Sequence, residues 1–160
     1  MNAASVAGPI VVRGNVALSR AGAADRRAAI YQPYHDAIAA ELDRRKLRSQ
    51  PTMLVSLHSF TPVVQGLARP WKFGVLHRHD SVLSHRVLHL LTARFGVEVG
   101  DNQPYSLDAK DNTIPLHADA REVDYLELEK GHDLIADEKG QCEIAEDAAE
   151  VLALSLGSTD

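Results

Sequence analysis

LVSLHSFTP, residues 54–62, is a short apolar run that follows Pro51, carries a histidine at position 58 and then breaks into a Ser/Thr/Pro turn. This pattern is typical of a buried strand that delivers a polar side chain to the rim of a sheet. Ligands of open α/β sheets bind at the carboxyl ends of the strands. We therefore interpret His58 as the centre of a hydrolytic metal site. A structural histidine with satisfied hydrogen bonds is the alternative, and this stretch alone does not decide between the two.

The rest of the chain predicts strands that alternate with helices. Ser19 fits a helix N-cap, and Pro33 predicts a kink or a split in the helix that follows it. The predicted helices are 19–46, 81–95, 117–121 and 137–156, and the predicted strands are 52–57, 72–76, 97–99 and 124–129. Such alternation indicates an α/β fold, with a mainly parallel or mixed sheet flanked by helices.

Composition limits the class of protein. The 160 residues fit a single domain over 1–160, and the net charge of −5 argues against a nucleic-acid-binding surface, which would carry a basic excess. No apolar run approaches the roughly 20 residues of a membrane span, so we expect no membrane insertion. The lone Cys142 cannot form an internal disulfide, and this favours a reducing, cytoplasmic location.

The last predicted strand carries two carboxylates that qualify as catalytic groups. In the segment YLELE, residues 125–129, Glu127 and Glu129 project from the same face of the strand. A solvated edge strand is the simpler explanation of this alternation. Next to a metal, one of the two carboxylates could instead act as a general base on a water molecule. His77 and His79 share a strand face in the same way, but their spacing equally fits a half-exposed strand.

A series of short motifs extends over most of the chain. They are GN at 14–15, LS at 18–19, YQPYH at 31–35, LVSLHSFTP at 54–62, RPWKFGVL at 69–76, GDNQPYS at 100–106, HA at 117–118 with Arg121, and DLIAD at 133–137. In this order and spacing the set resembles the C-terminal two thirds of the N-formylglutamate amidohydrolase family. Each motif is weak alone, whereas the ordered set is specific.

The resemblance implies a phosphorylase/hydrolase-like fold similar to that of zinc carboxypeptidases, and a site that uses Zn²⁺. The implied reaction hydrolyses N-formyl-L-glutamate, a small-molecule substrate, to formate and L-glutamate in histidine degradation. By the same resemblance His58 would be a metal ligand, Glu129 the general base, and Glu127 the reserve candidate for the base. The implied substrate-binding residues are Arg69, His117, Arg121, Asn102 and Tyr105.

Two departures from the family pattern qualify this expectation. The family's first segment, with a Pro-His motif and an acidic residue that supply further metal ligands, has no counterpart here. We therefore expect a fold that lacks the N-terminal part and exposes a sheet edge, which would invite homo-oligomer formation. Gly131 also stands where the family commonly has an arginine, unless Lys130 or His132 substitutes for it.

These departures leave two alternative functions. The chain could be a catalytically impaired remnant of the family that acts as a binding or structural module. It could also hydrolyse another N-acyl amino acid, since a pocket with fewer arginines should tolerate a less acidic substrate.

Overall fold

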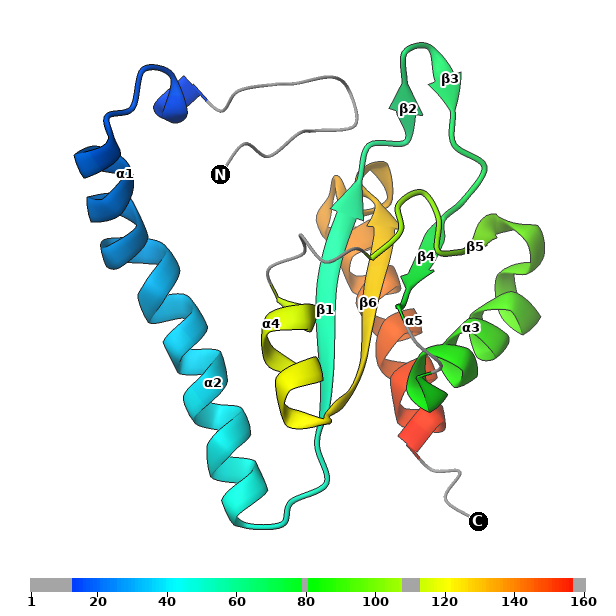
Figure 1. Cartoon of the computed structure of the whole chain (residues 1–160). Helices are drawn as coiled ribbons and strands as arrows, with labels where there is room; N and C mark the ends of the chain where they lie inside the picture. Colours follow the sequence, from blue (N-terminus) through cyan, green and yellow to red (C-terminus); the bar gives the residue numbers. More distant parts are fainter. Residues whose placement is uncertain (1–12, 79–80, 108–112, 157–160) are drawn as a thin grey trace. The chain divides into compact units, whose positions relative to one another are not determined.

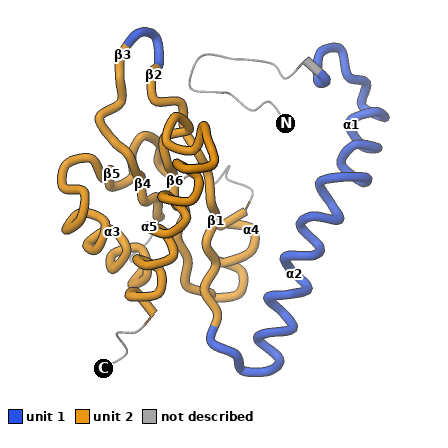
Figure 2. Tube along the Cα trace, turned by 180° about the vertical axis from the view of Figure 1, so that it is seen from behind, with its two compact units in different colours: residues 1–51, 64–66 blue, residues 52–63, 67–160 orange. Residues whose placement is uncertain are grey.

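The computed structural model describes residues 13–78, 81–107 and 113–156. The chain divides into two compact units, coloured separately in Figure 2. Unit 1 comprises residues 1–51 and 64–66, and unit 2 comprises residues 52–63 and 67–160. The predicted extent of one domain over 1–160 stays a prediction.

The described part of unit 1 is mainly helical. Its elements are a 3-10 turn (Arg13–Asn15), α1 (Arg20–Arg26), a π-helical segment (Arg27–Tyr31) and α2 (Gln32–Leu47). The Ser19 hydroxyl accepts a hydrogen bond from the amide of Gly22 at 3.0 Å, which confirms Ser19 as the N-cap of α1. Pro33 has no amide hydrogen for the preceding turn. The sequence predicted a kink or split there, and the chain accommodates the proline with the wider π-helical turn that immediately precedes α2.

Unit 2 contains a four-stranded sheet in the order β1-β6-β4-β5 (Figure 1). The strands of this sheet are β1 (Met53–Phe60), β4 (Phe73–Leu76), β5 (Val99–Asp101) and β6 (Asp124–Gly131). The short strands β2 (Val63–Val64) and β3 (Leu67–Ala68) form a separate two-stranded sheet. The helices of unit 2 are α3 (Val82–Phe95), α4 (Ile114–His117) and α5 (Glu138–Leu156), with 3-10 turns at Gly96–Glu98, Asp119–Arg121 and His132–Ile135. β1 runs parallel to β6, β4 runs parallel to β5, and β4 runs antiparallel to β6. The predicted α/β class with a parallel or mixed sheet is confirmed.

Helices cover both faces of this sheet. On one face, Leu126 and Leu128 of β6 join a buried cluster with residues of α3 and with Val151 of α5. On the other face, Tyr125 packs with Ile114 and Ala118 at α4. Figure 1 shows α4 and α5 on opposite sides of β6 accordingly. Because strand side chains alternate, Glu127 and Glu129 share the α4 face with Tyr125.

Several predicted boundaries need correction. β1 continues to Phe60, so His58 lies within the strand rather than at its end. The predicted start of the strand 97–99 is wrong by two residues. Gly96–Glu98 forms a 3-10 turn, and β5 begins to pair with β4 only at Val99. β4 ends at Leu76, before His77, and His79 lies outside the described residues. The helices α3 and α5 begin within a residue of their predicted starts and end where predicted.

Candidate active site

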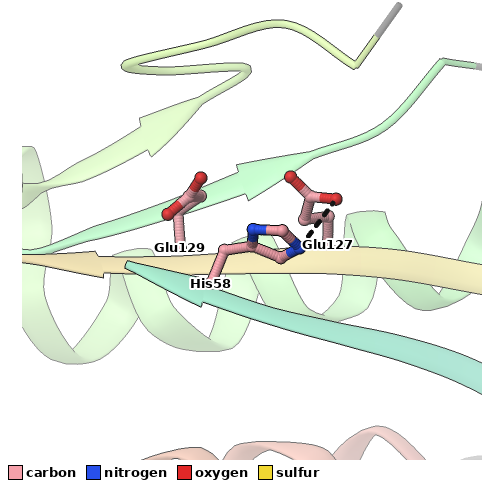
Figure 3. Close-up of side chains that lie close together, drawn as sticks. All are labelled: His58, Glu127 and Glu129. Atoms are coloured by element: carbon pink, nitrogen blue, oxygen red, sulfur yellow. Dashed lines mark ion pairs between the residues drawn. The ribbon is translucent and has the colours of Figure 1, made fainter. Parts of the chain in front are cut away.

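Three side chains from two neighbouring strands form a compact cluster on the α4 face. His58 comes from β1, whereas Glu127 and Glu129 come from β6. One potential ligand atom from each of the three lies within 4.8 Å of the other two. The parallel register places Ser56 opposite Glu127 and His58 opposite Glu129. Figure 3 shows all three side chains on the same side of their strands, as pairing in this register requires.

The cluster combines an accessible imidazole with buried carboxylates. The His58 side chain is 48% exposed, whereas Glu127 and Glu129 are almost fully buried. The Nε2 atom of His58 lies 3.8 Å from Oε2 of Glu127, the ion pair drawn as a dashed line in Figure 3. A solvent molecule or small ligand that reaches the imidazole therefore meets two carboxylates directly behind it.

Burial changes the proton affinity of Glu129. Removal from water raises the pKa of this carboxyl group to about 7, although the positive charges of Lys130 and Arg69 act to lower it. Its Oε2 atom is buried and accepts no hydrogen bond from the described part of the chain. A carboxyl group whose pKa lies near neutrality can take up and release a proton under ordinary conditions, as a general base must.

Lys130 holds the strand that carries His58. Its Nζ atom donates a hydrogen bond to the carbonyl oxygen of His58 at 2.9 Å. Burial lowers the pKa of Lys130, and the nearby charge of Glu129 opposes this effect. The sequence leaves open whether Lys130 substitutes for the family's arginine. The structure shows its ammonium group bound to the β1 backbone instead.

Arg69 and Tyr105 form one hydrogen-bonded pair. The Nη1 atom of Arg69 donates to the Tyr105 hydroxyl at 3.0 Å and to the Thr61 carbonyl at 3.0 Å. The guanidinium carbon also lies 4.9 Å from the centre of the Tyr105 ring. The guanidinium carbon also lies 5.6 Å from the centre of the ring of Phe60, the last residue of the strand that carries His58. Both predicted substrate-binding residues thus belong to one local arrangement.

Asn102, another of the implied substrate-binding residues, binds the backbone at the end of β4. Its side-chain oxygen accepts a hydrogen bond from the backbone amide of His77 at 2.9 Å. Its backbone amide donates a hydrogen bond to the Val75 carbonyl oxygen at 2.9 Å. Its φ of 50° lies in the left-handed region, which asparagine tolerates better than most residues. Asn102 therefore ends β5 in a tight turn against β4.

His117 and Arg121 lie next to each other at the end of α4. His117 is the last residue of α4 and is buried, and Arg121 follows in the 3-10 turn. The Nη1 atom of Arg121 donates to the His117 carbonyl at 3.4 Å. Both residues therefore belong to the helical layer on the sheet face that carries Glu127 and Glu129.

The donor set of the cluster fits a zinc ion. Zinc in proteins takes imidazole nitrogen and carboxylate oxygen at about 2.0–2.2 Å in a tetrahedral arrangement, so two ligand atoms of one ion lie about 3.4 Å apart. The three ligand atoms lie within 4.8 Å of one another, so the side chains would close by up to about 1.4 Å to hold one ion. A buried Glu129 oxygen without a hydrogen-bond donor is the kind of group that a cation would compensate.

Two contributors to this region were absent from the predicted site. One is Gly74, a strand glycine, which is a known signal for close backbone approach. The other is the hydrogen bond from Lys130 to β1, which depends on strand pairing that no local pattern shows.

The structure also has a surface hollow on α1 and the π-helical segment, lined by residues such as Arg27 and Tyr31, and this hollow contains none of the predicted site residues.

Comparison with known proteins identifies a family and a related fold. A model of the N-formylglutamate amidohydrolase family matches residues 2–136. The solved structure of gene product Atu2144 from Agrobacterium tumefaciens matches with a TM-score of 0.85 and 31% sequence identity. That match covers 97% of this chain and 61% of the Agrobacterium chain, so the present chain spans less than two thirds of its relative. No match was found among the curated proteins.

Within the described residues, no helix combines the length and the apolar character needed to cross a membrane. The family match extends over both strands that supply the cluster. The chain belongs to the N-formylglutamate amidohydrolase family.

Proposed function

We propose that this chain carries a metal-dependent amide hydrolase centre that acts on N-formyl-L-glutamate or a related N-acyl amino acid. The observation that carries the proposal is the convergence of His58, Glu127 and Glu129 on one site, with the carboxylates buried and the imidazole accessible. Membership of the family supplies the class of reaction. The substrate and the dependence on zinc are the parts that need experiment.

His58 and Glu127 are the residues assigned to hold the ion, because their side chains already approach each other at 3.8 Å. Zinc supplies Lewis acidity, which polarises a carbonyl group and lowers the pKa of a water molecule toward neutrality. Catalytic zinc commonly has three protein ligands. His58 and Glu127 account for two of them.

Glu129 is the assigned general base. Its pKa of about 7 leaves a substantial fraction deprotonated at neutral pH and still allows it to return the proton. Glu129 takes a proton from the attacking water as the water oxygen bonds to the formyl carbon. The carbon–nitrogen bond then breaks, and the proton passes from Glu129 to the departing amine. The products are formate and the free amino acid, so one water is consumed for each amide hydrolysed.

Arg69 is the cation assigned to the negative charge of the substrate. Guanidinium groups bind carboxylates in a planar, two-pronged geometry and also stabilise oxyanions. Arg69 lies close enough to Glu129 to affect its pKa, but within the described residues it makes no ion pair with it. Its charge therefore remains available to a substrate.

The test measures formate release from N-formyl-L-glutamate in zinc-supplemented buffer. We expect turnover by the parent, a loss of about 100-fold or more in kcat for Glu129→Gln, and loss of activity together with bound zinc for His58→Ala. Glu146→Gln, an exposed change on α5, is the control and should keep parental activity. No turnover by the parent at any zinc concentration would favour the impaired remnant. Turnover of only other N-acyl amino acids would favour a different substrate.

A further inference from the structure

The segment that follows β5 lies directly on the sheet because β4 has a glycine there. Gly74 pairs with Glu129 and is buried. A Cβ atom at position 74 would lie 1.9 Å from the carbonyl oxygen of Gln103 and 3.4 Å from Cβ of Glu129. The first distance is far below van der Waals contact. Only glycine therefore allows the backbone of Gln103 to lie beside the proposed general base.

A second glycine and a turn fix the same segment. A Cβ atom at Gly100 would lie 2.5 Å from Cβ of Gln103 and 3.2 Å from its carbonyl oxygen. Asn102 binds the backbone of Val75 in β4 through its own backbone amide, and the amide of His77, just after β4, through its side chain. These contacts direct the chain from β5 across the sheet, so that Tyr105 reaches Arg69, which is 36 positions earlier in the sequence.

The Tyr105–Arg69 pair leaves recognition groups available. Both side-chain hydrogen bonds of Arg69 come from Nη1, and within the described residues Nε and Nη2 have no hydrogen-bond partner. Arginine carries five N–H donors in a rigid fork, so three donors remain. The Tyr105 hydroxyl accepts from Arg69 and keeps its own proton for a further acceptor. Three remaining guanidinium donors and one hydroxyl proton, beside the end of the strand that carries His58, suit an anionic group.

We propose that Tyr105 is a positioning residue: its hydroxyl orients the Arg69 guanidinium so that the remaining donors bind a carboxylate of the substrate. This inference rests on the proposed function, because it specifies how that site recognises an acidic N-acyl amino acid. The glycines at 74 and 100 make the arrangement possible by admitting the Gln103 backbone. The competing explanation is a purely structural role, in which the Tyr105–Arg69 hydrogen bond only holds two loops together.

The test compares Tyr105→Phe with Tyr125→Phe. Tyr105→Phe removes one hydroxyl and keeps the ring that lies against the guanidinium. Tyr125→Phe makes the same chemical change at a hydroxyl that accepts a hydrogen bond from the Arg78 amide, away from Arg69. Kinetics are measured with N-formyl-L-glutamate and with its α- and γ-monoamides, which are nearly isosteric and each lack one of the two charges.

We expect Tyr105→Phe to raise KM about 10-fold for the diacid, with kcat changed less, because hydrogen bonds to charged groups are worth about that factor or more. The effect should persist with one monoamide and vanish with the other, which identifies the carboxylate that Arg69 binds. Tyr125→Phe should leave all three KM values close to those of the parent. If Tyr105→Phe changes KM equally for all three substrates, or for none, the proposal is overturned in favour of a purely structural role.

Failure of the proposed function can be distinguished from failure of this inference. If the parent shows no turnover, binding of L-glutamate, L-glutamine and L-isoglutamine is measured by calorimetry. Tighter binding of L-glutamate than of one of the two amides, weakened about 10-fold by Tyr105→Phe, would support the inference although hydrolysis is absent. No binding of L-glutamate by the parent would overturn it.

Discussion

The imidazole of His58 leans back along its strand toward Glu127 rather than toward Glu129, its partner in the β1–β6 register. Nε2 of His58 lies 3.8 Å from Oε2 of Glu127, whereas His58 and Glu129 form no ion pair within the described residues. Glu127 and Glu129 are only two positions apart, but their carboxylates have different surroundings (Figure 3). One is paired with the imidazole, and the other has a raised pKa.

The first prediction concerns metal binding. We expect His58→Ala and Glu127→Gln each to weaken zinc binding by at least about 100-fold, since each change removes an assigned ligand. Competition with a chelating dye gives the affinities. His89→Ala removes an exposed histidine of α3 and should leave the affinity unchanged. Parental affinity in both site variants would show that the cluster does not bind zinc.

The second prediction concerns the pH dependence of stability in the metal-free protein. The pKa of Glu129 is raised from 4.5 to about 7, so the folded state holds this proton more tightly than the unfolded state. Its contribution is fully present below pH 4.5 and is lost as the pH rises through 7. The free energy of unfolding of the parent should therefore fall relative to that of Glu129→Gln by about 2 kcal/mol between pH 5 and pH 8.

Urea denaturation in the presence of a chelator measures this difference at each pH. Glu146→Gln should follow the parent, because that side chain is exposed. Parallel curves for the parent and Glu129→Gln would mean that Glu129 titrates like a solvated carboxyl group.

The third prediction concerns the glycine under the Gln103 backbone. We expect Gly74→Ala to lower the free energy of unfolding by about 3 kcal/mol or more, because the new methyl group would meet a backbone oxygen at 1.9 Å. Gly131→Ala is the matched control in the neighbouring strand. There the added Cβ would meet the movable end of the Asp133 side chain at 2.6 Å, so about 1 kcal/mol or less is expected. Equal losses in the two variants would contradict the argument.

The fourth prediction concerns the lysine that binds the β1 backbone. Lys130→Met should weaken zinc binding by about 10-fold, because loss of the bond to the His58 carbonyl loosens the strand that carries a ligand. Lys139→Met, at a highly exposed position of α5, serves as the control. If Lys130→Met binds zinc as the parent does, then β6 pairing alone positions His58.

Much of the fold could be predicted because its signals are local. Ser19 and Ser81 cap their helices through neighbouring amides, and the alternating apolar and acidic residues of 125–129 fix which side chains share a strand face. The limits of β1 and β5 were missed because strands end where their partners end. Pairing with β6 extends β1 to Phe60, and a 3-10 turn delays β5 until Val99.

The sequence by itself determined the chemical candidates: a histidine in an apolar strand, two carboxylates on one face of another strand, and the motifs of a hydrolase family. Only the tertiary structure decided that these groups meet, because the β1–β6 register joins residues about 70 positions apart. It also decided the raised pKa of Glu129, the approach of His58 to Glu127 and the hydrogen bond from Arg69 to Tyr105. Burial, desolvation and backbone contact are properties of the packed sheet, and no stretch of sequence contains them.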